Sequence, residues 1–163
     1  MENNTIILGV DPGIANTGYA CLLCLEDTFR LLDVGVFVTQ KGPAEYRIKR
    51  IYEFFQQLIL TYHPDCMAME RLFFSKNVKT ALVVEEVRGS LMLLSAQQDL
   101  KLIQYTPLQI KKTLTHYGQA SKMEVKLVSE SLLNMALPTS DDACDAVAVS
   151  LCHAYNCDWG DIL

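Results

Sequence analysis

The sequence predicts an α/β domain in which a mixed five-stranded sheet is flanked by helices. Three β-rich runs separated by short gaps open the chain, a pattern typical of hairpin-linked antiparallel strands. Further on, segments with apolar residues every three or four positions alternate with short apolar runs, which indicates helices that cross over between parallel strands. The chain has 163 residues, 50% of them hydrophobic, which is the length of one domain with enough apolar side chains for a core.

Each expected strand is a short run rich in apolar and β-branched residues. The first is ended by Pro12-Gly13, and the third carries valines at the alternate positions 34, 36 and 38. The fourth is reached through a helix, so we expect it to run parallel to an earlier strand. The five expected strands span residues 5–11, 18–25, 29–39, 66–70 and 102–105.

The expected helices are indicated by the apolar period and by prolines. Ile51, Phe55 and Leu58 lie on one face of a long segment that Pro64 ends, and Pro107 can open a short helix. Helices are expected over residues 44–63 and 77–97, from residue 107, from residue 122, and over residues 140–155. Since no repeat or linker divides the chain, we expect one domain over residues 1–156 and a short acidic tail over residues 157–163.

Charge is distributed unevenly along the chain. The formal net charge is −5, yet residues 71–126 hold nine Lys and Arg against four Asp and Glu. This basic middle is compatible with a surface that binds a polyanion, because local field steers a phosphate backbone; a randomly uneven solvated surface is the alternative. The sequence shows no membrane-spanning stretch and no secretion signal, and its six cysteines lie mostly in apolar runs, so we expect a cytoplasmic protein with reduced thiols.

Four acidic residues stand where the predicted topology brings elements together. Asp11 ends the first strand and Glu70 the fourth, so both carboxylates leave the same sheet edge if these strands are parallel neighbours. Asp142 and Asp145 are three residues apart, on one face of the first turn of the last helix. Converging carboxylates repel each other unless a cation lies between them, and carboxylate oxygens bind Mg²⁺. The pattern favours a metal-dependent nuclease, in which two ions stabilise the attacking and leaving oxygens of a phosphodiester.

Each acidic residue also has an ordinary explanation. The aspartates within residues 141–145 could complement the positive end of a helix dipole, and Asp11 could belong to a common turn. Glu70 could pair with Arg71 or Lys76 at the surface. All of these explanations would have to hold together for the acidic cluster to have no function.

A set of short motifs, in a fixed order, gives the chain a family resemblance. The motifs are Ile-Leu-Gly-Val-Asp-Pro-Gly at 7–13, Thr17-Gly18, Met-Ala-Met-Glu-Arg-Leu-Phe at 67–73, Ser-Lys-Asn at 75–77, Ala81-Leu82, Arg88-Gly89, Gln-Ile-Lys at 109–111, Gly-Gln-Ala-Ser-Lys at 118–122 and Asp-Ala-Cys-Asp-Ala at 142–146. Through these motifs, from Ile6 to about Tyr155, the sequence resembles the RuvC family of Holliday-junction resolvases. The resemblance implies an RNase H-like fold.

The resemblance implies catalytic roles position by position. It makes Asp11, Glu70, Asp142 and Asp145 the metal-binding catalytic acids, for Mg²⁺ with Mn²⁺ as a plausible substitute and two ions per active site. Lys122 falls where family members place a basic residue near the scissile phosphate, so it is also expected to be catalytic. The implied products are a 5′-phosphate and a 3′-hydroxyl.

The resemblance and the basic segment together indicate residues that contact DNA. Phe73 matches an aromatic residue that family members insert against a base near the branch point. Lys111 matches a basic position linked to junction contact, and a solvated helix face is an equally good explanation for it. The expected DNA-binding residues are Phe73, Arg71, Lys76, Lys79, Lys111 and Lys122. Arg88, in the same basic segment, is a further candidate for phosphate contact.

The resemblance also implies partners. A four-way junction has approximate two-fold symmetry, so a homodimer with two identical active sites suits paired nicks. Cooperation with a branch-migration motor in recombination and repair is implied as well. A possible dimer interface is the apolar stripe of residues 81, 84, 87, 91 and 94. The stripe could instead pack on the subunit's own sheet, and we expect a helix this apolar to do both; Gly89 would permit close approach to a partner.

Other function classes share parts of the pattern. ATP-binding proteins of the actin and sugar-kinase type also end their first strand in Asp-x-Gly, but they need a second domain and a second phosphate loop, which this chain lacks. A catalytically silent nucleic-acid-binding module is disfavoured because all four acids are present. A related RNase H-like nuclease acting on RNA stays open, since its acids would look the same. Cys21 and Cys24 have the spacing of a redox motif, but in a strand they would point to opposite faces as core residues.

Overall fold

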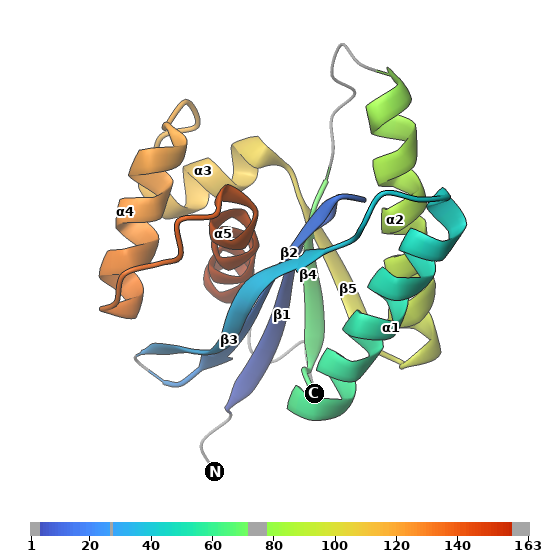
Figure 1. The fold of residues 1–163 in the computed structure, drawn as a ribbon. Helices are drawn as coiled ribbons and strands as arrows, with labels where there is room; N and C mark the ends of the chain where they lie inside the picture. Colours follow the sequence, from blue (N-terminus) through green and yellow to red (C-terminus); the bar gives the residue numbers. More distant parts are fainter. Residues whose placement is uncertain (1–3, 27, 72–77, 158–163) are drawn as a thin grey trace.

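A mixed five-stranded sheet forms the centre of the protein (Figure 1). The computed structural model describes residues 4–26, 28–71 and 78–157, and for 78–80 it describes the backbone only. The strands are β1 (Thr5–Asp11), β2 (Asn16–Cys24), β3 (Phe29–Val38), β4 (Cys66–Glu70) and β5 (Lys101–Tyr105). Their order in the sheet is β3-β2-β1-β4-β5. The predicted fold class is confirmed; β2 and β5 begin two residues and one residue earlier than predicted, and β2 and β3 end one residue earlier.

The direction of the strands follows from their connections. β1, β2 and β3 are antiparallel neighbours, as short hairpin gaps require. β4 is reached through a helix and runs parallel to β1, with Val10 opposite Met69, and β5 is parallel to β4. Asp11 follows Val10 and Glu70 follows Met69, so two carboxylates leave the neighbouring strands β1 and β4 at one edge of the sheet.

Helices cover both faces of the sheet (Figure 1). They are α1 (Ala44–Tyr62), α2 (Val78–Gln97), α3 (Pro107–Thr115), α4 (Lys122–Leu133) and α5 (Asp141–Asn156). One core cluster lies between the sheet and α3, α4 and α5, and the other lies between the sheet and α1 and α2. Cys21 and Cys24 belong to different clusters, which confirms that they are core thiols on opposite faces of β2. Within the described residues, no helix is both long and apolar enough to span a membrane.

Helix α2 packs on the subunit's own sheet through part of its apolar stripe. Val87, Leu91 and Leu94 are fully buried against the subunit's own sheet, so this stripe is not available to a partner. Other apolar residues of α2 remain exposed, namely Leu82 at 55%, Met92 at 43% and Leu93 at 55%. The interpretation of the stripe as an interface is therefore wrong for these three residues, which belong to the subunit's own core.

Helix α5 approaches the sheet more closely than a side chain would allow. A Cβ atom built on Gly9 would lie 2.2 Å from the backbone oxygen of Ala146, and one built on Gly18 would lie 1.9 Å from that of Asp142. Gly18 also pairs with Asp11 across β1 and β2. The missing side chain at Gly18 thus lets the first turn of α5, with Asp142, lie directly over the sheet edge that carries Asp11.

We predict that Gly18→Ala lowers the free energy of unfolding by about 1–3 kcal/mol, because the added methyl group overlaps the Asp142 carbonyl and α5 must move. Urea denaturation measures this change. Gly42→Ala is the matched control, since a Cβ atom there meets nothing within 4 Å. Equal stability of the two variants would contradict the close packing of α5.

Candidate active site

Four carboxylates converge at the edge of the sheet where β1 and β4 end. Asp11 and Glu70 are the last residues of these parallel neighbours, and both are half-buried. Asp142 and Asp145 lie on the first turns of α5, which packs across β1 and β2. The structure therefore brings together all four acids that the sequence singled out.

Burial and mutual repulsion act together on Asp11. The pKa of Asp11 is raised to about 8, first by burial and then by the neighbouring charges of Glu70, Asp145 and Asp142, while Lys122 acts in the opposite direction. An isolated carboxylate at the end of an apolar strand would keep its negative charge only at a large energetic cost. The site therefore needs positive charge before Asp11 is ionised at neutral pH.

The pKa values of Glu70 and Asp142 are shifted in the same direction. Burial is the main cause for each, and the charge of Asp145 adds to it. Lys122 opposes the shift at both carboxylates. The helix-dipole alternative concerns only the aspartates of α5, and Asp11 is the last residue of β1 rather than part of a turn.

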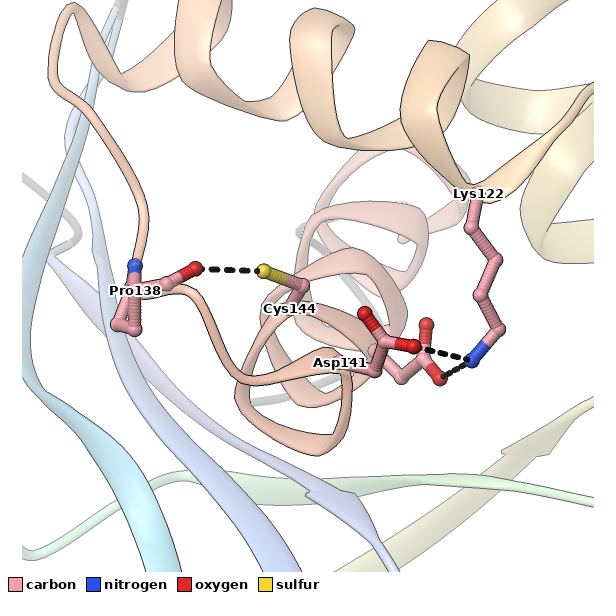
Figure 2. A network of polar contacts seen from close by, with 5 residues as sticks. Lys122, Pro138, Asp141 and Cys144 are labelled. Carbon is pink, nitrogen blue, oxygen red and sulfur yellow. Dashed lines mark hydrogen bonds and ion pairs between the residues drawn. The ribbon is translucent and has the colours of Figure 1, made fainter.

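Lys122 supplies positive charge from the facing helix. It follows Ser121, whose hydroxyl and the Glu124 carboxylate form a capping box that fixes the start of α4. Its ammonium donates a hydrogen bond to Asp145 Oδ2 at 2.7 Å and lies 4.0 Å from Asp141 Oδ2 (Figure 2). Burial lowers the pKa of Lys122, but the hydrogen bond and charge of Asp145 outweigh burial, so the net direction is upward.

A cleft of about 200 Å³ opens between these groups. Glu70, Lys111, Lys122 and Asp145 line it, and Ile110, Val125 and Ala148 are among its apolar wall residues. Lys111 is thus placed at the candidate active site, although the sequence left a solvated helix face as an equal alternative. Two acids and two lysines in one cleft suit a phosphate that approaches together with cations.

A second hollow of about 550 Å³ lies next to Asp142. Asp142 lines it together with residues 13–16, Arg47, Val83 and Val84. The guanidinium of Arg47 donates hydrogen bonds to Thr39 Oγ1 and to the carbonyl of Ile14, which connect the start of α1 to the loop after β1. Sequence reasoning missed Arg47, because nothing in the α1 pattern distinguishes it from other exposed basic residues.

The remaining basic candidates have different outcomes. Arg71 is exposed next to Glu70, as a DNA contact requires. Arg88 is only 3% exposed and its head group faces protein atoms, so its interpretation as a phosphate contact is wrong. Phe73 and Lys76 lie outside the described residues, and so does the side chain of Lys79.

The donor set has the chemistry that a hard divalent cation requires. All four groups are carboxylates, and their raised pKa values show that positive charge would be favourable among them. Within the part of the chain that the structure describes, no three Asp, Glu, His or Cys side chains lie close enough together to hold an ion as placed. In this arrangement Lys122 holds Asp145, so ion binding would involve movement of that side chain.

The sheet order, the parallel β1–β4 pair and the acidic cluster at their ends are those of an RNase H-like domain. Comparison with known proteins narrows this class. The family model described as crossover junction endodeoxyribonuclease RuvC matches residues 7–153. The chain belongs to the RuvC family.

Relatives and solved structures agree with this assignment. The crossover junction endodeoxyribonuclease RuvC of Halothermothrix orenii is 42% identical over 161 residues, which cover 95% of this chain and 98% of that protein. The RuvC protein of Desulforamulus reducens is 40% identical over 151 residues, covering 91% and 93% of the two chains. The structure of Thermus thermophilus RuvC in complex with Holliday junction substrate is similar with a TM-score of 0.90 at 28% identity, covering 96% of each chain.

We predict that Asp11→Asn raises the melting temperature of the metal-free protein at about pH 8. A carboxyl group whose pKa rises from 3.8 to about 8 on folding binds its proton more tightly in the folded state, so stability is lost as pH rises between these values. Asparagine does not titrate, so the variant escapes this loss, and its advantage should shrink as the pH approaches about 4.

Thermal melts in EDTA across this pH range test the prediction. Asp99→Asn is the matched control, because Asp99 is exposed beyond the end of α2 and its left-handed backbone suits asparagine. The same pH dependence in wild type and Asp11→Asn would show that Asp11 is ionised throughout.

Proposed function

We propose that this protein is a crossover junction endodeoxyribonuclease that resolves four-way DNA junctions by paired nicks in recombination and repair. The observation that carries the proposal is the convergence of four carboxylates at one sheet edge, where Glu70 and Asp145 line a cleft together with Lys122. Membership of the RuvC family supports it, as does the likeness to a RuvC structure solved with Holliday junction substrate.

We propose Mg²⁺ as the cofactor, with Mn²⁺ as a substitute and two ions per active site. Asp11, Glu70, Asp142 and Asp145 would hold them through carboxylate oxygens. Bound there, the ions would supply the positive charge that activates water and stabilises the oxygens at phosphorus. The raised pKa of Asp11 means that this carboxyl group gives up its proton when positive charge arrives.

The chain's own cations would then act on the phosphate. Lys122 reaches the cleft from α4 and would stabilise the negative charge that develops on the phosphoryl oxygens. Lys111, on the cleft wall, would hold the DNA backbone in place. Water oxygen forms a bond to phosphorus, the bond from phosphorus to the 3′ oxygen breaks, and that oxygen takes up a proton, which leaves a 5′-phosphate and a 3′-hydroxyl.

A homodimer would place two such sites on one junction. The outward face of α2 supports this arrangement, because Leu82, Met92 and Leu93 are exposed and a Cβ atom at Gly89 meets nothing within 4 Å. A two-fold symmetric contact through this face would bury these apolar side chains from both subunits. Cooperation with a branch-migration motor stays an expectation from the family resemblance.

We predict that the wild-type protein nicks a synthetic four-way junction in Mg²⁺ and not in EDTA. Paired nicks should fall on two strands of like polarity, because a dimer presents two identical sites. Glu70→Gln should reduce the nicking rate at least about 10³-fold, since it removes a carboxylate from the cluster. Glu53→Gln, an equal change at an exposed position of α1, is the control and should keep the wild-type rate.

Denaturing gels of end-labelled strands give the result. A linear duplex and an RNA–DNA hybrid of the same sequence are cut in parallel with the junction. If the linear duplex is cut as fast as the junction, the protein is a nuclease without selectivity for junctions. Preferential cutting of the hybrid would favour the RNA nuclease, and junction binding without any cutting would indicate a silent binding module.

A further inference from the structure

Arg88 is a buried cation beside the candidate active site. It lies on α2 and is 3% exposed, although arginine heads usually remain in water. Its Nη1 donates to the backbone carbonyl of Glu70, and its Nη2 donates to Oε1 of Gln104 on β5. Its Nε lies 3.1 Å from Oε1 of Glu85, one turn earlier on the same helix. One planar head group therefore connects α2, β4 and β5.

The contact with β4 falls on the peptide that follows the catalytic carboxylate. The carbonyl of Glu70 accepts from Arg88, and the N–H of Arg71, in the same peptide group, donates to the carbonyl of Tyr105 at 2.7 Å. Glu70 and Tyr105 also form the last residue pair between β4 and β5. Arg88 and Tyr105 thus hold both ends of one peptide plane, which fixes the backbone rotation of Glu70 where the regular strand ends.

The geometry of the guanidinium suits this task better than its charge alone. Its N–H groups point in fixed directions within one plane, so the acceptors on β4 and β5 are held in register with each other and with α2. A lysine at the same position would keep the charge but lose the planar fork. The Glu85 partner is half-exposed, so it balances charge at the rim while the other two acceptors lie further inside.

We propose that Arg88 is a positioning residue for the nicking reaction, which sets the direction of the Glu70 carboxylate by holding the Glu70–Arg71 peptide. This inference rests on the proposed function, because it assigns Arg88 to the active site that performs it. Arg88 contacts neither DNA nor the reacting atoms; it acts through the backbone of Glu70. An arginine that only stabilised the core would change the melting temperature and leave the chemistry of the folded fraction alone.

The test is Arg88→Lys in the full-length protein, with Glu85→Gln as control. Single-turnover nicking of a saturating four-way junction in Mg²⁺ gives the rate, and binding to the same junction in EDTA gives Kd. We expect Arg88→Lys to reduce the rate on the order of 10- to 100-fold, because small displacements of a catalytic group have effects of this size. Its junction Kd should stay within about twofold of the wild-type value, and Glu85→Gln should keep the wild-type rate and Kd.

Binding of Mn²⁺, followed through the electron paramagnetic resonance signal of the free ion, gives a readout independent of turnover. A misdirected Glu70 should weaken Mn²⁺ binding in Arg88→Lys and leave it unchanged in Glu85→Gln. Thermal melts establish that the variants are folded. If Arg88→Lys does not fold, Gln104→Leu removes one acceptor of the fork and should show the same loss of rate at unchanged Kd.

The outcomes separate this inference from the proposed function. If the wild-type protein nicks the junction and a folded Arg88→Lys nicks it at the same rate, the positioning role is overturned and the resolvase function is kept. The same holds for Gln104→Leu if that variant has to replace Arg88→Lys. An equal loss in Glu85→Gln would also overturn it, since charge balance rather than the Glu70 carbonyl contact would then be responsible. No nicking by the wild-type protein would overturn the proposed function, and the role of Arg88 with it.

Discussion

Repulsion among carboxylates at one sheet edge is the constraint on which the rest of the structure depends. Asp11 and Glu70 are brought together by the parallel pairing of β1 and β4, and α5 adds Asp142 and Asp145. Burial of these groups disfavours their charged forms, as the raised pKa of Asp11 records. A fold that only had to be stable would gain nothing from gathering acids here, which is why we propose that the cluster binds cations and a phosphate.

Positive charge reaches the acidic edge from three directions. Lys122 contacts Asp145 from α4, Lys111 lines the same cleft from α3, and Arg88 lies beneath the edge on α2. The three cations differ in what they can do. The two lysines face the cleft, where a phosphate could contact them, whereas Arg88 is enclosed by protein and is directed at the backbone. A chain of net charge −5 can therefore still bring two lysines to the place where a phosphate would lie, because the field near the phosphate matters more than net charge.

Much of this arrangement could be predicted from the sequence, for reasons that are local. Hairpin spacing, the change of period at Ala44 and the strand-ending positions of Asp11 and Glu70 were sufficient for the fold class and the acidic edge. The packing of helix α2 was ambiguous because its own apolar residues are distributed over all of its faces, so the sequence pattern does not tell which face packs inward. The burial of Arg88 was not predictable, since its acceptors come from β4 and β5 and only the tertiary structure brings them together.

The most direct test of this account is the number of protons released when Mn²⁺ binds to the metal-free protein at neutral pH. Titration calorimetry in two buffers of different ionisation enthalpy measures that number. The account predicts saturable binding with release of about one proton by the wild-type protein and less by Asp11→Asn, because the raised pKa of Asp11 favours its protonated form in the metal-free protein. Saturable binding without proton release, or no saturable binding by the wild-type protein, would contradict it.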